Sequence, residues 1–345
     1  MADYAMELVE RYDFVVQKTN RIRGGILCDT DKGLFALREY TGSSKRLAFQ
    51  NTFLEEMERL GPVHVDWLLP DQEENLVNAA ADGKNYVMRR WYTGKEPDIR
   101  KSKEVCKLSG ALAMVHLMYQ KLKPLPPGEY PGKSICVSEE YQKYIKEKKR
   151  TSHYIVKKTV KMPYERMLLR EYGEFYYQAE HALKHIHQAE EELLDTEAEK
   201  YDGVRHGNYT YHSLLMYGEN LAVFDCGMVR RGLSICDFYA LLRKTMEKTE
   251  WDIRTGETLF AGYEGFLPIS RAERKLLLAM LEFPYKYWKL LNHYNNSSKA
   301  WIPERSLEKL ERICRQREKK ERFITEFFGD SFSKTSVHTI GNGYQ

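Results

Sequence analysis

The stretch VRHGNYTYHSLLMYGENLAVFDCGM, residues 204–228, decides how the rest of the chain is interpreted. It combines a His-Gly pair, a polar loop, a short apolar strand and Asp225 at the end of that strand. Such features suit phosphoryl transfer, which needs a base beside the attacking hydroxyl and groups that hold magnesium. Here Asn208 stands where a carboxylate would act as the base, and Ser213 stands where an amide would bind the metal. The stretch therefore raises the question whether the chain is an enzyme or has kept only an enzyme's shape.

The composition is that of a globular protein with a sizeable core. The chain has 345 residues, of which 42% are hydrophobic and 30% charged, and this balance argues against disorder. No apolar run approaches the roughly 18 residues that a membrane-spanning helix needs. The N-terminal MADYAMELVERYDF is acidic and amphipathic and lacks the features of a signal peptide. We therefore expect a protein that is made and kept inside a cell, with no membrane span.

Charge and cysteine usage exclude two further classes of site. The net charge of +4 comes from 54 basic and 50 acidic residues, which is near balance and argues against a nucleic-acid partner. The basic run KEKKR, residues 146–150, is interpreted as a solvated helix face rather than a phosphate-binding patch. The six cysteines are scattered and form no C-x-x-C pair, so we expect reduced thiols and no zinc site.

The order of predicted elements indicates an α+β protein with two lobes. Residues 1–90 read as a β-rich lobe whose short strands are interrupted by one helix, from near Ser44 to Gly61. Residues 91–100 are the predicted hinge, and 101–332 form a helical lobe that carries the loop 204–228. Proline and glycine predict a surface loop or linker at 123–133, and 333–345 form a polar tail. Helices are expected over about 103–122, 138–160, 163–198, 234–248, 255–266, 270–293 and 303–329.

The sequence RHGNYTYHSLL resembles the catalytic loop H-G-D-x-x-x-x-N of the aminoglycoside phosphotransferase and choline kinase superfamily. His206 matches the motif, whereas Asn208 replaces its catalytic Asp and Ser213 its metal-binding Asn. Asp225 falls at the position of the superfamily's magnesium-binding Asp, and Asp237 at that of a structural Asp that steadies the catalytic loop. The resemblance therefore implies a bilobal protein-kinase-like fold with an altered catalytic loop.

The upstream parts of a nucleotide site are also identified by this resemblance. GLFALREY resembles the strand that carries the nucleotide-binding lysine, but Arg38 stands at that position. Glu55 or Glu56 would supply the lysine's partner carboxylate, although either could equally face solvent. The two glycines in KTNRIRGGILCDTDKG would form the phosphate-covering hairpin, or simply a tight turn. Backbone groups of the hinge segment would face an adenine; these are Met88, Arg89, Arg90 and Trp91.

One subfamily matches more of the chain. EFPYKYWKLLNHYNNSSKAW, residues 282–301, together with YVMRRWYTGKEPD and RHGNYTYHSLL, resembles the spore coat protein S (CotS) family of spore-forming bacteria. The resemblance extends from about residue 10 to 330. It implies synthesis in the mother cell, a place in the spore coat and other coat proteins as partners. The aromatic segment itself is expected to be a packed helix and corner of the helical lobe.

Three substitutions together favour a catalytically degenerate kinase-like scaffold that acts in coat assembly. Asn208 cannot accept a proton as a carboxylate does, and a general base contributes about 10²- to 10⁴-fold to a rate. Ser213 is a poorer magnesium ligand than Asn, and Arg38 differs from Lys in shape and reach. The abundance of tyrosine, 24 residues, and of lysine suits surface contacts and cross-linking in a coat, although amphipathic helices use the same residues.

Two alternatives remain open. The first is an active ATP- and magnesium-dependent phosphotransferase that acts on a small-molecule hydroxyl. It would rely on Asp225, and on His212 as a replacement base, although His212 could equally be a solvent-facing loop residue. The second is a kinase that acts on coat proteins. In the degenerate case, the cleft could still bind a nucleotide through Arg38 and nearby backbone groups.

Overall fold

The computed structural model describes residues 7–22, 24–81, 83–122, 132, 134–296 and 304–329. The predicted tail lies outside this part of the chain, as does the predicted linker 123–133 apart from Gly132. The chain divides into two compact units. Unit 1 comprises Met1–Ile135, Glu197–Thr245 and Glu257–Ile269, and unit 2 comprises Cys136–Thr196, Met246–Gly256 and Ser270–Gln345. The hinge predicted at 91–100 falls within unit 1 and stays a prediction.

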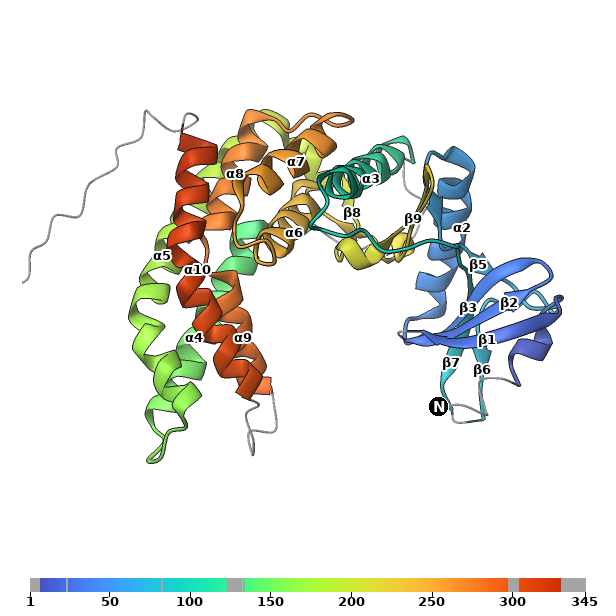
Figure 1. Ribbon diagram of the computed structural model, residues 1–345, viewed down its shortest axis with the longest axis horizontal. Helices are drawn as coiled ribbons and strands as arrows, with labels where there is room; N and C mark the ends of the chain where they lie inside the picture. Colours follow the sequence, from blue (N-terminus) through green and yellow to red (C-terminus); the bar gives the residue numbers. More distant parts are fainter. Residues whose placement is uncertain are drawn as a thin grey trace, which may run out of the picture. The chain divides into compact units, whose positions relative to one another are not determined.

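Unit 1 contains an antiparallel sheet in the order β1-β2-β3-β7-β5, with β6 paired to β7 (Figure 1). The predicted glycine turn joins β1 to β2, with Gly24 at a φ of +79°. One face of the sheet covers a core that includes Leu8 and, from the 3-10 helix η1, Val9–Arg11, the side chain of Val9. The strands are β1 Val16–Ile22, β2 Gly25–Thr30, β3 Gly33–Glu39, β5 Leu68–Leu69, β6 Asn78–Ala79 and β7 Asn85–Arg90.

Helix α2, Ser44–Leu60, begins and ends where the sequence predicts. The hydroxyl of Ser43 accepts a hydrogen bond from the backbone amide of Arg46 and caps the helix. Gly61 follows the last turn with a φ of +54°, which favours glycine. The buried face is apolar except for Gln50, and it consists of Leu47, Phe49, Gln50, Phe53, Leu54 and Met57. A buried amide on an otherwise apolar face must find polar partners.

A parallel strand pair joins the hairpin that precedes Asp225 to the segment that follows α2. Strand β4, His64–Val65, pairs with β10, Asn220–Val223, which also forms an antiparallel hairpin with β9, Leu214–Tyr217. This pairing holds the strand that leads to Asp225 beside the segment that follows α2. The unit also contains α3 Ser102–Lys121, η2 Ala198–Asp202, η3 Tyr211–Ser213, η4 Cys226–Met228, α6 Ile235–Met246, most of α7 Ile253–Glu264, and the pair β8 Val204–Arg205 and β11 Arg230–Arg231.

Unit 2 is built from helices, with an aromatic-rich core shared by α4, α5, α9 and α10 (Figure 1). Helix α9 supplies most of the predicted aromatic segment and buries Tyr287, Trp288 and Tyr294. Its remainder, residues 297–301, lies outside the described residues. The helices are α4 Val137–Val156, α5 Pro163–Glu197, α8 Arg271–Glu282, α9 Tyr285–Asn296 and α10 Glu304–Phe328.

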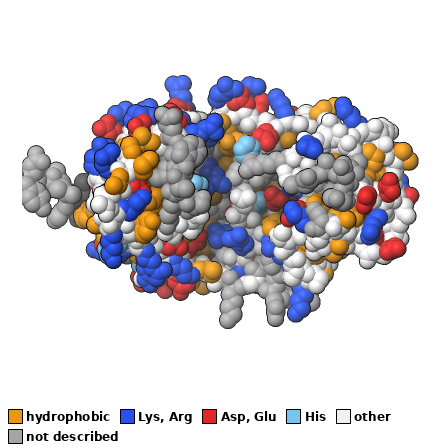
Figure 2. Space-filling view, turned by 90° about the horizontal axis from the view of Figure 1, so that it is seen from below, with side chains coloured by type: hydrophobic (Ala, Val, Ile, Leu, Met, Phe, Trp, Pro, Cys, Tyr) orange, Lys and Arg blue, Asp and Glu red, His pale blue; other side chains and the backbone are white. Residues whose placement is uncertain are grey.

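The surface carries both signs of charge. Figure 2 shows basic and acidic side chains interspersed over the face it draws, with apolar side chains among them. Within the described residues, no helix combines the length and apolar character needed to cross a membrane.

Candidate functional site

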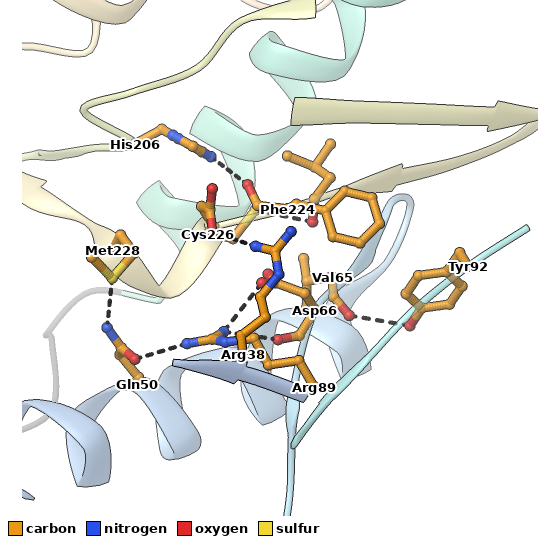
Figure 3. Close-up of polar contacts among 12 residues, drawn as sticks. Arg38, Gln50, Val65, Asp66, Arg89, Tyr92, His206, Phe224, Cys226 and Met228 are labelled. Atoms are coloured by element: carbon orange, nitrogen blue, oxygen red, sulfur yellow. Dashed lines mark hydrogen bonds and ion pairs between the residues drawn. The ribbon is translucent and has the colours of Figure 1, made fainter. Parts of the chain in front are cut away.

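His206 and Asp237 form the framework of the loop that the sequence singles out. The backbone amides of His206 and Gly207 donate to the two carboxylate oxygens of Asp237, at 2.5 and 2.8 Å. The buried imidazole of His206 places Nε2 2.7 Å from the carbonyl oxygen of Phe224 (Figure 3). Because a carbonyl can only accept, Nε2 carries the proton and Nδ1 accepts from the amide of Asn208 at 3.3 Å. The loop is therefore fixed from both sides.

Asp237 is a buried carboxylate whose partners are complete. Besides the two loop amides, Nε2 of His116 on α3 lies 3.1 Å from Oδ2, and Nδ1 of His116 lies 2.7 Å from the hydroxyl of Tyr263. Burial acts to raise the pKa of Asp237, but the hydrogen bond from His116 and the nearby positive charges hold this pKa below its usual value. Asp237 thus stays ionised while it orients the loop.

The two altered motif positions are used for loop structure. Asn208 is exposed, and its backbone carbonyl lies 3.5 Å from the hydroxyl of Ser213. That hydroxyl also accepts from the amide of Thr210 at 3.1 Å, while the Thr210 side chain accepts from the amide of His212. Ser213 is 7% exposed and closes this reciprocal cap of η3. One lone pair of its hydroxyl is therefore all that these bonds leave for any other partner.

Asp225 follows β10 and has a left-handed backbone, with a φ of +62°. Nη1 of Arg38, from the middle of the sheet, lies 3.5 Å from its Oδ1. The side chains of Arg38 and Asp225 keep 23% and 40% of their exposure, so both are reached by solvent. The structure thus brings together the predicted phosphate-binding and metal-binding positions, and it pairs them with each other.

A second, fully buried ion pair lies beside this one. Nη1 of Arg89 on β7 lies 3.1 Å from both the carboxylate and the backbone carbonyl of Asp66 (Figure 3). Nη2 of Arg89 donates to the side-chain oxygen of Gln50 at 3.1 Å, and the amide of Gln50 contacts the sulfur of Met228. The pair Arg89–Asp66 therefore ties β7 to the segment after β4, and Gln50 extends the network to η4.

Sequence reasoning missed Asp66 and Gln50. A usable signal exists for each of them. Asp66 is the one acidic residue in the largely apolar run VHVDWLLP. Gln50 shares the helical spacing of the buried residues Leu47, Leu54 and Met57.

The predicted hinge residues lie mostly in the sheet. Met88 and Arg89 pair with β3 on one side and β5 on the other, and Arg90 pairs with Phe35. Trp91 comes next, and its amide donates to the carbonyl of Leu34 at 2.9 Å. The indole ring of Trp91 lies 4.2 Å from the ring of Phe224, and the guanidinium of Arg38 lies 5.1 Å from it on a cation–π contact.

A cavity of about 310 Å³, which we call the hinge cavity, lies beside Trp91. Its lining includes Gly33, Trp91, Thr93, Leu215 and Ala222. Among the described residues that line it, neither Arg38 nor Asp225 is found. Trp91 therefore lines this cavity and also contacts Phe224 and Arg38.

Three other candidate side chains lie apart from this pair. Glu55 accepts from Asn51, and Glu56 pairs with Arg59, so neither carboxylate is bonded to Arg38. Nδ1 of His212 lies 2.7 Å from a carboxylate oxygen of Glu96, and both side chains are about half exposed. The alternative of solvent-facing side chains at these three positions agrees with the structure.

The donor set is poorer than that of a kinase-type magnesium site. Mg²⁺ needs oxygen ligands in near-octahedral geometry and is usually held by one or two carboxylates together with phosphates. Here Asp225 is the one carboxylate offered, and a guanidinium already accompanies it. The hydroxyl of Ser213 serves as a cap, and the side chain of Asn208 is a neutral amide. We therefore derive no phosphoryl-transfer step from this site.

A family model described as "Spore coat putative kinase YutH" matches residues 5–327. The chain belongs to this family. Membership confirms the resemblance to spore coat proteins that the motifs indicated, and it extends over nearly the whole chain. No curated protein sequence matches the chain significantly.

Solved structures confirm the fold. An aminoglycoside phosphotransferase from Alicyclobacillus acidocaldarius aligns with a TM-score of 0.76 and 17% identity, covering 94% of this chain and 95% of that one. A microcompartment-associated aminopropanol kinase aligns with a TM-score of 0.60 and 15% identity, covering 96% and 99%. A spectinomycin phosphotransferase, solved with ADP and spectinomycin, aligns with a TM-score of 0.61 and 10% identity, covering 92% and 97%. The protein therefore has the α+β, aminoglycoside phosphotransferase type of kinase-like fold.

Proposed function

We propose that this protein is a catalytically silent kinase-like scaffold that acts in assembly of the spore coat. The family supplies the link to the coat. The observation that carries catalytic silence is the use of the Ser213 hydroxyl as a loop cap, beside an Asp225 that is paired with Arg38. Ser213 thus keeps one lone pair beyond its cap, and Asp225 shares its carboxylate with a guanidinium, so a metal here would find fewer free donors than the superfamily motif offers.

The neutral loop amide supports the same proposal. Asn208 cannot take the proton of an attacking hydroxyl, and loss of a general base costs about 10²- to 10⁴-fold in rate. His212 is the other candidate base, and because its Nδ1 is bonded to Glu96, only its Nε2 could take the proton. Meanwhile Asp237 and His206 hold the loop through its amides and the carbonyl of Phe224, so the loop is ordered although its motif residues differ.

The position of Trp91 argues against ordinary nucleotide binding. The resemblance assigns the adenine to the space beside the strand that ends at Arg90 and Trp91. The indole of Trp91 lines the hinge cavity and contacts both Phe224 and Arg38. We infer that this ring narrows the path of a nucleotide from the cavity to Asp225.

Other coat proteins are the partners that follow from this proposal, with synthesis in the mother cell before deposition in the coat. Exposed aromatic side chains are available for such contacts, including Tyr177 at 63% and Tyr217 at 64% exposure. In the proposed organisation, residues 1–90 form the β-rich lobe, 91–100 the hinge, and 101–332 the helical lobe.

The alternative function is ATP- and magnesium-dependent phosphoryl transfer to a small-molecule hydroxyl or to a coat protein. The observation that favours it is the intact framework of His206 and Asp237, which presents Asp225 in a left-handed conformation at the end of β10. Structures of similar fold were solved with ADP or with AMP-PNP and Ca²⁺. In this alternative a metal at Asp225 competes with the guanidinium of Arg38, and Ser213 offers it only the lone pair that its cap leaves.

A thermal-shift titration with ATP, with and without magnesium, tests the proposal. A ligand that binds only the folded state must raise the melting temperature by mass action. We expect no magnesium-dependent shift in the native protein and no ATP turnover. The double substitution Asn208→Asp with Ser213→Asn is the matched gain-of-function variant. A magnesium-dependent shift in the native protein that disappears in Asp225→Ala, accompanied by ATP turnover, would establish the alternative instead.

A further inference from the structure

Two histidines and a glutamate meet on the surface of unit 2, outside the kinase-like loop. His181 and His185 are one helical turn apart on α5, and Glu282 is the last residue of α8. One donor atom from each of the three residues lies within 4.8 Å of the other two. Nδ1 of His185 is already 2.6 Å from Oε2 of Glu282. Helix α5 and the end of α8, almost a hundred positions apart in the sequence, thus bring these three side chains together.

The donor set is one that divalent transition metals prefer. Two imidazoles and one carboxylate form the protein ligands of many zinc sites, in which water takes the fourth position. Histidines at positions i and i+4 point to the same face of a helix, which is the spacing needed for two ligands to share an ion. The two imidazole rings are 4.4 Å apart between centroids and inclined by 70°. Small side-chain rotations would bring all three donors to bonding distance.

The surroundings also suit an exchangeable ion. His181 is exposed, and the side chains of His185 and Glu282 keep 40% and 27% of their exposure, so an ion can enter from solvent. Lys320 lies nearby, but its ammonium is bonded to the backbone carbonyls of Glu282 and Phe283. The Glu282 carboxylate is therefore left to the histidines.

We propose that His181, His185 and Glu282 bind a zinc ion, with the fourth position open to water. The ion would link the middle of α5 to the end of α8 within unit 2. This site belongs to unit 2, whereas Asp225 belongs to unit 1. It is independent of the proposed catalytic silence. The cysteine pattern gave no sign of it because no cysteine takes part.

Isothermal titration of the untagged full-length chain with Zn²⁺ tests this proposal, together with the visible spectrum of the Co²⁺-loaded protein. The native chain should bind one ion and give the absorption of four- or five-coordinate cobalt. His181→Gln, His185→Gln and Glu282→Gln should each weaken binding by at least about tenfold, a loss typical even of groups that only support a metal ligand. His187→Gln is the matched control, because His187 is an exposed histidine on the same helix.

Circular dichroism of the metal-free variants shows whether each one folds. The exposed His181→Gln should fold even where Glu282→Gln does not, so the test does not depend on one variant. Equal zinc affinity in native protein and His181→Gln would overturn the proposal, as would octahedral cobalt spectra in both. A loss of affinity in His187→Gln equal to that in His181→Gln would also overturn it, because binding would then not need the three named ligands.

Discussion

Arg38 and Asp225 are 187 positions apart in the sequence, yet Nη1 of Arg38 lies 3.5 Å from Oδ1 of Asp225. Both side chains are partly exposed, so their attraction is screened and contributes about 1 kcal/mol at most to the free energy of unfolding. The pair therefore matters less for stability than for what it blocks. A divalent cation at Asp225 would have to compete with a guanidinium that is already present.

Breaking the buried pair of Asp66 and Arg89 should, by contrast, lower the free energy of unfolding strongly. Their side chains keep 1% and 7% of their exposure, and Gln50 accepts a further bond from Arg89. Asp66→Ala leaves a buried guanidinium without its countercharge, so we predict a loss of about 3–5 kcal/mol in the free energy of unfolding. Urea denaturation, followed by circular dichroism, measures this loss.

The control for this prediction is an exposed ion pair of similar length. Lys32 and Asp13 are 2.7 Å apart with side-chain exposures of 52% and 85%, so Asp13→Ala should cost less than about 1 kcal/mol. The double variant Asp66→Ala with Arg89→Met should lose less than the sum of its single variants. Additive losses would show that the buried contact is not energetically coupled.

Asp237 should make stability depend on pH at the acid end. Burial acts to raise its folded-state pKa, but the hydrogen bond from His116 and nearby positive charge hold this pKa below the usual value. A lowered folded pKa gives stability that is present above the unfolded value near 4 and lost as the pH falls through the folded value. Asp237→Asn should cost roughly 3 kcal/mol at pH 7, because its amide opposes buried donors.

Chemical denaturation at a series of pH values between 7 and 3 checks this prediction. The native protein should lose more stability across this range than Asp237→Asn does. Asp202→Asn is the matched control, since Asp202 is exposed and precedes the same loop. Parallel curves for the native protein and Asp237→Asn would contradict the assigned role of the carboxylate.

The sequence predicted the helices and the fold class because their signals are local and periodic. Helix α2 was expected from near Ser44 to Gly61, and α3 and α5 lie within a few residues of their predicted bounds. The order of motif residues also indicated that His206, Asp225 and Asp237 belong to one loop system. Contacts such as His206 with Asp237 follow from such a motif even when its chemistry is altered.

The rest of the site could not be read from the sequence because it depends on short, non-local pairings. Strands β4, β5 and β6 have two residues each, which is too short for an alternating pattern to show. Strand β5 pairs Leu68 with Arg89, which brings the nearby Asp66 within reach of the Arg89 side chain, and β4 pairs with β10. Likewise, the sequence predicted the backbone of Trp91 as part of a hinge, but it held no information on where the indole would lie.

Lys148 is a buried cation, and the cost of burying its charge should be measurable as a loss of stability. It is 0% exposed and has no hydrogen-bond partner within the described part of the chain; its ammonium lies over the rings of Phe283 and Tyr287. Burial, helped by the nearby charge of Lys320, lowers the pKa of Lys148 to about 7. Lys148→Met should therefore stabilise the protein at pH 6 by roughly 3 kcal/mol, because each tenfold loss of proton affinity costs about 1.4 kcal/mol and the ring contacts offset part of it.

The gain from Lys148→Met should shrink as the pH rises. Between pH 7 and about 10.5 the folded state binds fewer protons than the unfolded state, so the native protein gains stability with pH. Near pH 10.5 both states hold a neutral amine, and the two proteins should have similar stability. Thermal melts from pH 6 to 10 measure the difference, and Lys146→Met is the control on the exposed face of the same helix. A gain that is constant with pH would mean that packing, not charge, is responsible.

Substitution of Trp91 tests whether its ring hinders the binding of a nucleotide. Its indole contacts both Phe224 and Arg38 and also lines the hinge cavity. Trp91→Ala should open that cavity toward Arg38, so ADP without magnesium should now raise the melting temperature by a few degrees, as expected once ligand exceeds its Kd about 100-fold. Trp91→Phe keeps an aromatic ring in place and should respond no more than the native protein. The effect should vanish in the double variant Trp91→Ala with Arg38→Ala, because the guanidinium would no longer bind the phosphates. If Trp91→Ala melts independently of ADP, the indole is a packing residue and does not exclude nucleotide.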